Sequence, residues 1–168
     1  PDATDLRSMG IGLQSIEISG SPRGKQADKT GPPVSKVSLD GIVYTSVFSP
    51  LDGRKNWDDM VTAFCTAFQD VEDATLVLKM SHHSLSSFLG KLHFMLHQLS
   101  PFKCRIVALH GYMDSMEYEK LVAATHYYVN ASKCEGLCLP LMEFMACRKP
   151  SLSPRHTAMA DYIHPSST

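Results

Sequence analysis

The sequence has no excess of either charge and no long apolar run. Its 168 residues include 16 Lys and Arg against 17 Asp and Glu, which gives a net charge of -1. A general nucleic-acid binder usually carries a basic excess, so we expect no nucleic-acid partner. The longest nearly uncharged stretch, residues 136–147, is too short to span a bilayer. The opening residues lack the charged-then-apolar pattern of a signal peptide.

Cysteine is sparse and odd in number. The five cysteines do not follow the spacing of a disulfide framework. Cys134 and Cys138 lie four positions apart, but no second ligand pair follows at a zinc-site spacing. We therefore expect reduced thiols and a cytoplasmic protein, or one that sits peripherally at the inner face of the membrane.

Several motifs that mark well-known binding and catalytic sites are missing. The sequence contains no G-x-G-x-x-G after a strand, no G-x-x-x-x-G-K-[ST] and no G-x-S-x-G. It therefore lacks the dinucleotide fingerprint, the P-loop and the nucleophile elbow of α/β-hydrolases. No acidic cluster suits a divalent metal, so we expect neither a metal nor another cofactor.

The first 40 residues form the least regular part of the sequence. Residues 20–33 are rich in Gly and Pro and lie between two short apolar segments, near 13–18 and 34–39, that we predict to be strands. The segment is either a long hairpin or a connector between domains. The chain begins with Pro1 and ends in a polar string, so we expect it to be a piece of a longer protein.

From residue 41 onward, strand and helix patterns alternate. β-Branched or apolar runs predict strands at 42–48, 75–78, 105–109 and 127–129 and around Leu152. Apolar spacings of three and four predict a helix capped by Asn56 or Asp58, and further helices at 85–99, 116–124 and 140–147. Short apolar strands that alternate with helices are typical of a Rossmann-like, doubly wound parallel sheet in an α/β domain, which we place at residues 41–168.

Ligands of such sheets bind beyond the carboxyl ends of the strands. Arg54 and Lys55 lie in the loop after the first of these strands, where two adjacent cations suit a diphosphate. The other interpretation is a solvated charged turn with Asp52 as the local partner. Lys79 ends the next strand at the same edge, where its ammonium either reaches water or points into the crevice.

Two glutamates follow the strand at 127–129. Glu143 lies in a nearly uncharged, strongly apolar stretch, and a carboxylate there is costly to bury without a partner. That partner is either a structural donor or the hydroxyl pair of a ligand such as ribose. Glu135 precedes the helix and is either a crevice residue or a capping carboxylate.

The stretch at 132–143 resembles the E-x7-E signature of retaining GT-B glycosyltransferases, the large group 1 (family 4) class. Glu135 and Glu143 are separated by seven residues, in the setting Ser132-x-x-Glu135-Gly136-x-x-Leu139-Pro140-x-x-Glu143. Residues 54–57, 76–79, 109–113 and 148–154 are similar to other segments of that family, so the resemblance covers about 42–163. The chain departs from the family in residues 48–51, which lack the usual Arg, and at Leu137-Cys138, which replace an aromatic residue and a glycine.

The resemblance implies half of a GT-B fold, in which two Rossmann-like domains face each other across a cleft. This chain would be the C-terminal half, which binds a nucleotide-diphosphate sugar, and the N-terminal acceptor domain would be absent. The implied activity is a retaining, metal-independent, hexosyltransferase-type transfer to a saccharide or lipid-linked acceptor, as in polysaccharide biosynthesis. The isolated domain is expected to be inactive. The alternatives are a nucleotide-sugar epimerase-like GT-B enzyme and a non-catalytic nucleotide-sugar-binding module.

The resemblance also assigns roles to individual residues. The catalytic positions are Lys55, which would contact the donor diphosphate, and Glu135, which would face the sugar. Glu143 would bind the ribose hydroxyls. The further donor-binding residues are Arg54 beside the diphosphate, Lys79 in the same crevice, Tyr112 and Met113 around the base, and Leu137, Cys138 and Leu139 through their amides.

Overall fold

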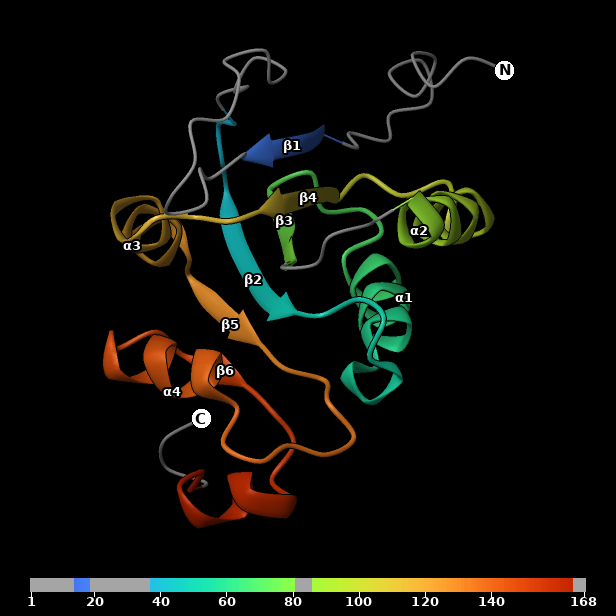
Figure 1. Ribbon diagram of the computed structural model, residues 1–168. Helices are drawn as coiled ribbons and strands as arrows, with labels where there is room; N and C mark the ends of the chain where they lie inside the picture. Colours follow the sequence, from blue (N-terminus) through green and yellow to red (C-terminus); the bar gives the residue numbers. More distant parts are fainter. Residues whose placement is uncertain (1–13, 19–36, 81–85, 165–168) are drawn as a thin grey trace.

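The computed structural model describes residues 14–18, 37–80 and 86–164. A six-stranded sheet in the order β1-β4-β3-β2-β5-β6 forms its centre, and all neighbouring strands are parallel (Figure 1). The strands are β1 (Gln14–Ile18), β2 (Ile42–Phe48), β3 (Ala74–Met80), β4 (Arg105–Gly111), β5 (Tyr127–Val129) and β6 (Ser151–Leu152). The helices are η2 (Gly53–Lys55), α1 (Trp57–Ala67), α2 (Ser86–Leu99), α3 (Ser115–Ala124), α4 (Leu139–Ala146) and η3 (Thr157–Asp161).

The strand order confirms the predicted doubly wound sheet. From β2 the chain adds β3 and then β4 on one side, whereas β5 and β6 lie on the other side of β2. The direction of winding therefore reverses between β2 and β5, which pair through Tyr44–Tyr127 and Thr45–Tyr128. Ligands of such sheets usually bind beside the loops at the carboxyl ends of the two strands where the winding reverses. In this chain the two loops are those that precede α1 and α4.

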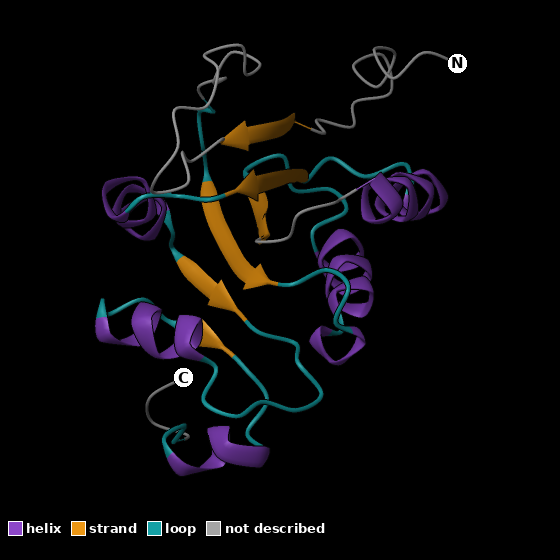
Figure 2. Ribbon diagram, in the orientation of Figure 1, coloured by secondary structure: helices purple, strands orange, loops and turns teal. Residues whose placement is uncertain are grey.

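Helices cover both faces of the sheet (Figure 2). On one face α1 and α2 pack on the strands through a core that includes Phe64, Leu76 and Leu92. On the other face α3 and α4 bury Leu121 and Phe144 in two further clusters. Because both faces are covered, the side chains of the central strand β3 are buried along its whole length.

Local sequence explains where several helices begin. Asp114 caps α3, and the reciprocal hydrogen bonds between Asp114 and Glu117 form a capping box. Pro140 occupies the first turn of α4, where a missing N–H costs nothing. Asn56 is the N-cap residue of α1, as predicted, but its backbone is left-handed and, within the described residues, its side chain makes no capping hydrogen bond.

The prediction of an N-terminal hairpin is wrong for residues 14–18. This segment forms β1, which pairs in parallel with β4 at the edge of the sheet. A hairpin needs antiparallel neighbours, whereas β1 and β2 run in the same direction with β4 and β3 between them. Residues 37–39, the described part of the second predicted strand, form no strand, and the Gly- and Pro-rich segment 20–33 lies outside the described residues. None of the helices in the described part of the chain is long and apolar enough to cross a membrane.

Candidate functional site

The loops that follow β2 and β5 meet at the switch point of the sheet. The first contains η2, which carries Arg54 and Lys55, and the second carries Glu135. Figure 1 shows the loop after β5 extending toward η2 before it returns to α4. The backbone N–H of Lys133 donates to the carbonyl of Arg54 at 2.7 Å, which joins the two loops directly. The sequence placed these two loops at the same edge of the sheet, and the structure shows that they are in contact.

Both cations of η2 bind the same carboxylate. Arg54 Nη1 lies 2.6 Å from Glu135 Oε2, and Lys55 Nζ lies 2.5 Å from Oε1. Arg54 also donates from Nη1 to the carbonyl of Cys134, and its Nε pairs with Asp52 at 2.7 Å. The Glu135 side chain is only 4% exposed, whereas that of Lys55 is 15% and that of Arg54 40% exposed. The acid lies at the base of the cluster, and the guanidinium faces solvent.

Electrostatics keep Glu135 ionised despite its burial. Desolvation is the largest single influence and raises the pKa of this carboxyl, but hydrogen bonds from Lys55, Ser132 and Arg54 together lower the pKa below its ordinary value. The same contacts act on the partner, because the hydrogen bond from Arg54 to Glu135 raises the pKa of the guanidinium. The nearly buried carboxylate of Glu135 therefore stays charged because both cations pair with it.

A polar network fixes the loop that carries Glu135. The amide side chain of Asn130 accepts from the N–H of Ser132 at 3.2 Å and donates to Ser153 Oγ at 3.1 Å. The N–H of Glu135 donates to Thr157 Oγ1 at 3.1 Å. The ends of β5 and β6 therefore hold the loop from two sides. A carboxylate on such a fixed loop is pre-organised rather than mobile.

Glu143 lies on the exposed side of α4. Its carboxylate carries no cost of burial, because Leu141 and Phe144 take the buried positions of the helix. Its Oε2 accepts a hydrogen bond of 2.9 Å from the hydroxyl of Tyr118 on α3. The Tyr118 ring packs edge-on against Phe144, and burial raises the pKa of its hydroxyl, so it stays a donor. The carboxylate is thus positioned at the surface by a fixed neighbour.

The residues around the start of α4 alternate between exposed and buried. Leu137 and Leu139 are 60% and 59% exposed, whereas Cys138 between them is buried. Cys138 has a left-handed backbone with φ 51° and ψ 59°. This conformation favours glycine, which is the residue that the resembling family usually has here. Cys138 therefore holds a backbone conformation that residues other than glycine rarely adopt.

Lys79 lies close to the loop that follows β4, and its ammonium is shielded from solvent. Lys79 is buried, and its Nζ donates to the carbonyls of Met80 and Gly111. Burial lowers the pKa of this ammonium, partly offset by the charge of Glu117. The neighbouring Tyr112 is exposed, and Met113 packs partly against the core. Lys79 thus braces the loop that begins at Gly111.

The sequence analysis missed three residues that hold the site. Tyr118, Ser132 and Thr157 each donate to or accept from one of the two glutamates or its backbone. Tyr118 and Thr157 lie more than 20 residues from the glutamates that they contact, and no local pattern indicates such pairs. Ser132 was part of the motif but had no role assigned.

The cations and Glu143 offer two kinds of polar contact to a ligand. Lys55 and the exposed guanidinium of Arg54 retain N–H donors for an incoming phosphate, and Glu143 retains acceptor capacity for hydroxyls. Among the described residues, no group of three or more His, Cys, Asp or Glu side chains gathers as a metal site requires. The expectation that the chemistry needs no metal stays a prediction.

Comparison with known proteins bears on the fold of the chain. No family model matches the sequence, and no curated protein matches it. Among solved structures, the chain is similar to the C-terminal domain of a glycosyl transferase group 1 family protein (LpcC) from Francisella tularensis, with a TM-score of 0.56 and 23% identity. The match covers 67% of this chain and 58% of that chain. The chain therefore has a Rossmann-like fold similar to that of a glycosyltransferase half-domain.

Proposed function

We propose that this chain is the donor-binding half of a retaining, metal-independent glycosyltransferase. It would move a hexose-type sugar from a nucleotide-diphosphate sugar to a saccharide or lipid-linked acceptor, which an N-terminal domain of the same longer protein would hold. The observation that carries the proposal is the convergence of Arg54 and Lys55 with Glu135 at the switch point. The likeness in fold to a glycosyltransferase domain supports it.

The ion pairs suggest how the donor engages. A diphosphate would bind Arg54 and Lys55 through the N–H donors that Glu135 leaves free. The carboxylate of Glu135 would keep its place on the fixed loop, next to the sugar that adjoins the diphosphate in any such donor. The two cations then offset the charge of the departing nucleoside diphosphate, a role that many transferases give to a metal ion.

The remaining residues bind the nucleoside in this proposal. Glu143 would accept hydrogen bonds from the ribose hydroxyls while Tyr118 holds its other oxygen. Backbone groups of Tyr112 and Met113 would bracket the base, in a loop that Lys79 braces through the carbonyl of Gly111. The amides of residues 137–139 at the start of α4 would face the sugar or the phosphate.

Thermal denaturation with candidate donors tests the proposal. A ligand that binds the folded state alone raises the melting temperature. We expect UDP- or GDP-sugars at millimolar concentration to raise it, Glu143→Ala to abolish the shift, and EDTA to leave it unchanged. Absence of a shift with sugars of any common nucleotide base would contradict the proposal.

A second candidate is a non-catalytic nucleotide-sugar-binding module. It is favoured by the burial of Glu135, whose two oxygens are both engaged by cations in the free chain. Turnover separates the two: with the acceptor domain restored, a transferase consumes donor and forms a glycoside of retained configuration. A module binds the donor and leaves it intact.

A further inference from the structure

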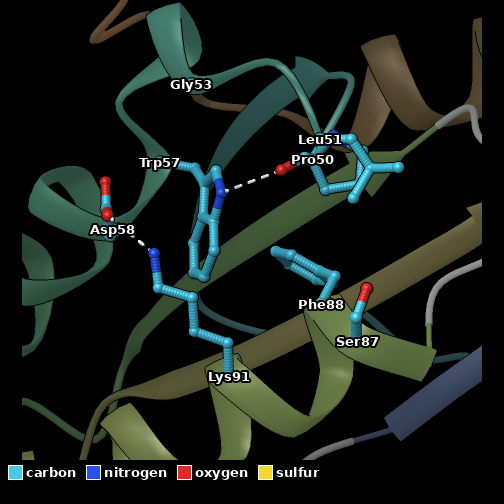
Figure 3. Close-up of a pocket in the computed structure, with 8 residues that line it drawn as sticks. All are labelled: Pro50, Leu51, Gly53, Trp57, Asp58, Ser87, Phe88 and Lys91. Carbon is cyan, nitrogen blue, oxygen red and sulfur yellow. Dashed lines mark hydrogen bonds and ion pairs between the residues drawn. The ribbon is translucent and has the colours of Figure 1, made fainter.

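A cavity of about 340 Å³ lies beside Gly53, the first residue of η2 (Figure 3). It opens between the loop after β2 and the first turns of α2, at the carboxyl edge of the sheet. Trp57 and Phe88 form its buried wall, and Asp58, Ser87 and Lys91 bring polar groups to its mouth. Small-ligand pockets usually measure roughly 300–1,000 Å³, so the cavity has room for a small ligand.

The charges that line the cavity are already balanced. Lys91 Nζ lies 3.0 Å from Asp58 Oδ2, and the same ammonium sits 4.9 Å from the centre of the Trp57 ring (Figure 3). The indole N–H is also satisfied, because it donates to the carbonyl of Pro50 at 3.2 Å. An anion would have to displace Asp58, and a cation would have to displace Lys91. The cavity therefore favours a neutral ligand.

The remaining hydrogen-bonding capacity is of mixed type. The ammonium of Lys91 has three N–H donors, the carboxylate of Asp58 has several acceptor positions, and the exposed hydroxyl of Ser87 can do both. Hydroxyl groups of a ligand also donate and accept. The rings of Trp57 and Phe88, whose centres lie 4.5 Å apart at an angle of 67°, form an apolar wall. Both residues are almost fully buried, so only a small part of this wall is open to the C–H groups of a ligand. A sugar ring has hydroxyl groups around its edge and apolar C–H groups on its face, so it is complementary to this combination of polar and apolar lining.

The cavity shares an element with the candidate donor site. Gly53 lines the cavity and is the first residue of η2, and the next two residues are the cations that pair with Glu135. We propose that this cavity binds a neutral saccharide. If the chain is a glycosyltransferase, as proposed above, this saccharide is part of the acceptor, held by the donor-binding half.

The fluorescence of Trp57 tests the proposal directly, because Trp57 is the only tryptophan in the sequence. We expect uncharged methyl hexosides or disaccharides to change its emission in a saturable way. Lys91→Met and Asp58→Asn should each weaken the binding about five- to tenfold, the effect of removing one or two hydrogen bonds. Lys120→Met, an exposed lysine on α3, serves as the matched control and should leave the binding unchanged. Circular dichroism verifies that each variant is folded.

Three results would overturn the saccharide site. These are no response to any sugar of the panel, a response that both cavity variants retain, and a response to inorganic phosphate that Lys91→Met removes. Glu143→Ala separates the two proposals, because Glu143 does not line the cavity. The variant should lose the binding of nucleotide sugars and keep the fluorescence response to neutral sugars.

If neutral sugars bind the cavity but no nucleotide sugar stabilises the chain, the saccharide site stands and the proposed donor site fails. If nucleotide sugars stabilise the chain but no neutral sugar changes the Trp57 emission, the donor site stands and the saccharide site fails.

Discussion

Lys55 and Glu135 lie 80 residues apart in the sequence and form an ion pair of 2.5 Å across the switch point of the sheet. Lys55 comes from the loop after β2 and Glu135 from the loop after β5, so the pair fixes the position of one loop relative to the other. The same two groups are those that a diphosphate and a sugar would need. The contact stabilises the fold, and under the proposed function it also takes part in donor binding, so substitutions there should change both.

Lys55→Met should lower the free energy of unfolding by about 1–3 kcal/mol, because it leaves a nearly buried carboxylate with fewer donors. Urea denaturation at neutral pH measures the effect. The matched control is Lys91→Met, which breaks the exposed ion pair with Asp58 and should cost no more than about 1 kcal/mol. Equal costs at the two positions would show that burial of Glu135 adds nothing to the strength of its pair.

The stability of the chain should also depend on the ionisation of Glu135. Its pKa in the folded state lies below the ordinary value of 4.5. The stabilisation is therefore complete above that ordinary value and is lost as the pH falls through the lower, folded-state pKa. Glu135→Gln cannot lose a charge, so the difference in unfolding free energy between the native chain and this variant should be largest near neutral pH and shrink in acid.

Denaturation curves of both proteins at several pH values from neutral to about pH 3 provide the measurement. Glu143→Gln is the control for the removal of an exposed carboxylate. A constant difference between native chain and Glu135→Gln over the whole pH range would contradict the ionised state derived for Glu135.

Much of the sheet could be predicted from sequence because its signals are local. Strands β2 to β5 are short apolar runs, and each is followed by a segment with helical spacing or a capping residue such as Asp114. The pairing of β1 with β4 could not be predicted in this way. It joins residues more than 90 positions apart, and nothing in residues 14–18 indicates whether their neighbour is parallel or antiparallel.

Part of the candidate site could likewise be predicted from the sequence, and part could not. The meeting of Arg54 and Lys55 with Glu135 follows from strand order, because the loops after β2 and β5 flank the switch point. The exposure of Glu143 does not follow from the sequence of α4. That helix has more apolar residues than positions facing the core, and it leaves Leu139 and Met142 exposed. Which side turns inward is decided by packing against β5, β6 and α3.

Cys138 should be sensitive to the shape of its substituent rather than to its size. With φ 51°, its backbone is in the left-handed region, where a β-branched side chain is strained. Cys138→Val, which fills a similar volume, should lower the unfolding free energy by about 1–2 kcal/mol. Cys138→Gly removes more buried surface but also removes the backbone strain, so it should lower the unfolding free energy by less than the valine variant does.

Cys147→Val is the control, because Cys147 is exposed and has an ordinary φ of -82°. It should change the unfolding free energy by at most about 0.5 kcal/mol. A glycine variant less stable than the valine variant would show that packing outweighs backbone strain.

Tyr118 should act on nucleotide binding through Glu143. The hydroxyl of Tyr118 holds one oxygen of this carboxylate at 2.9 Å, and its loss lets the side chain of Glu143 rotate away from a ribose diol. Tyr118→Phe should therefore weaken binding of a ribonucleoside diphosphate about three- to tenfold in titration calorimetry. Binding of the 2′,3′-dideoxy analogue, which has no diol, should be unchanged between the native chain and the variant.

Tyr127→Phe controls for the general effects of removing a tyrosine hydroxyl. Tyr127 is the first residue of β5, whereas the candidate site lies beyond the last residue of that strand. Equal weakening of both ligands by Tyr118→Phe would mean that Tyr118 supports the fold of the site and does not orient Glu143 toward the ribose.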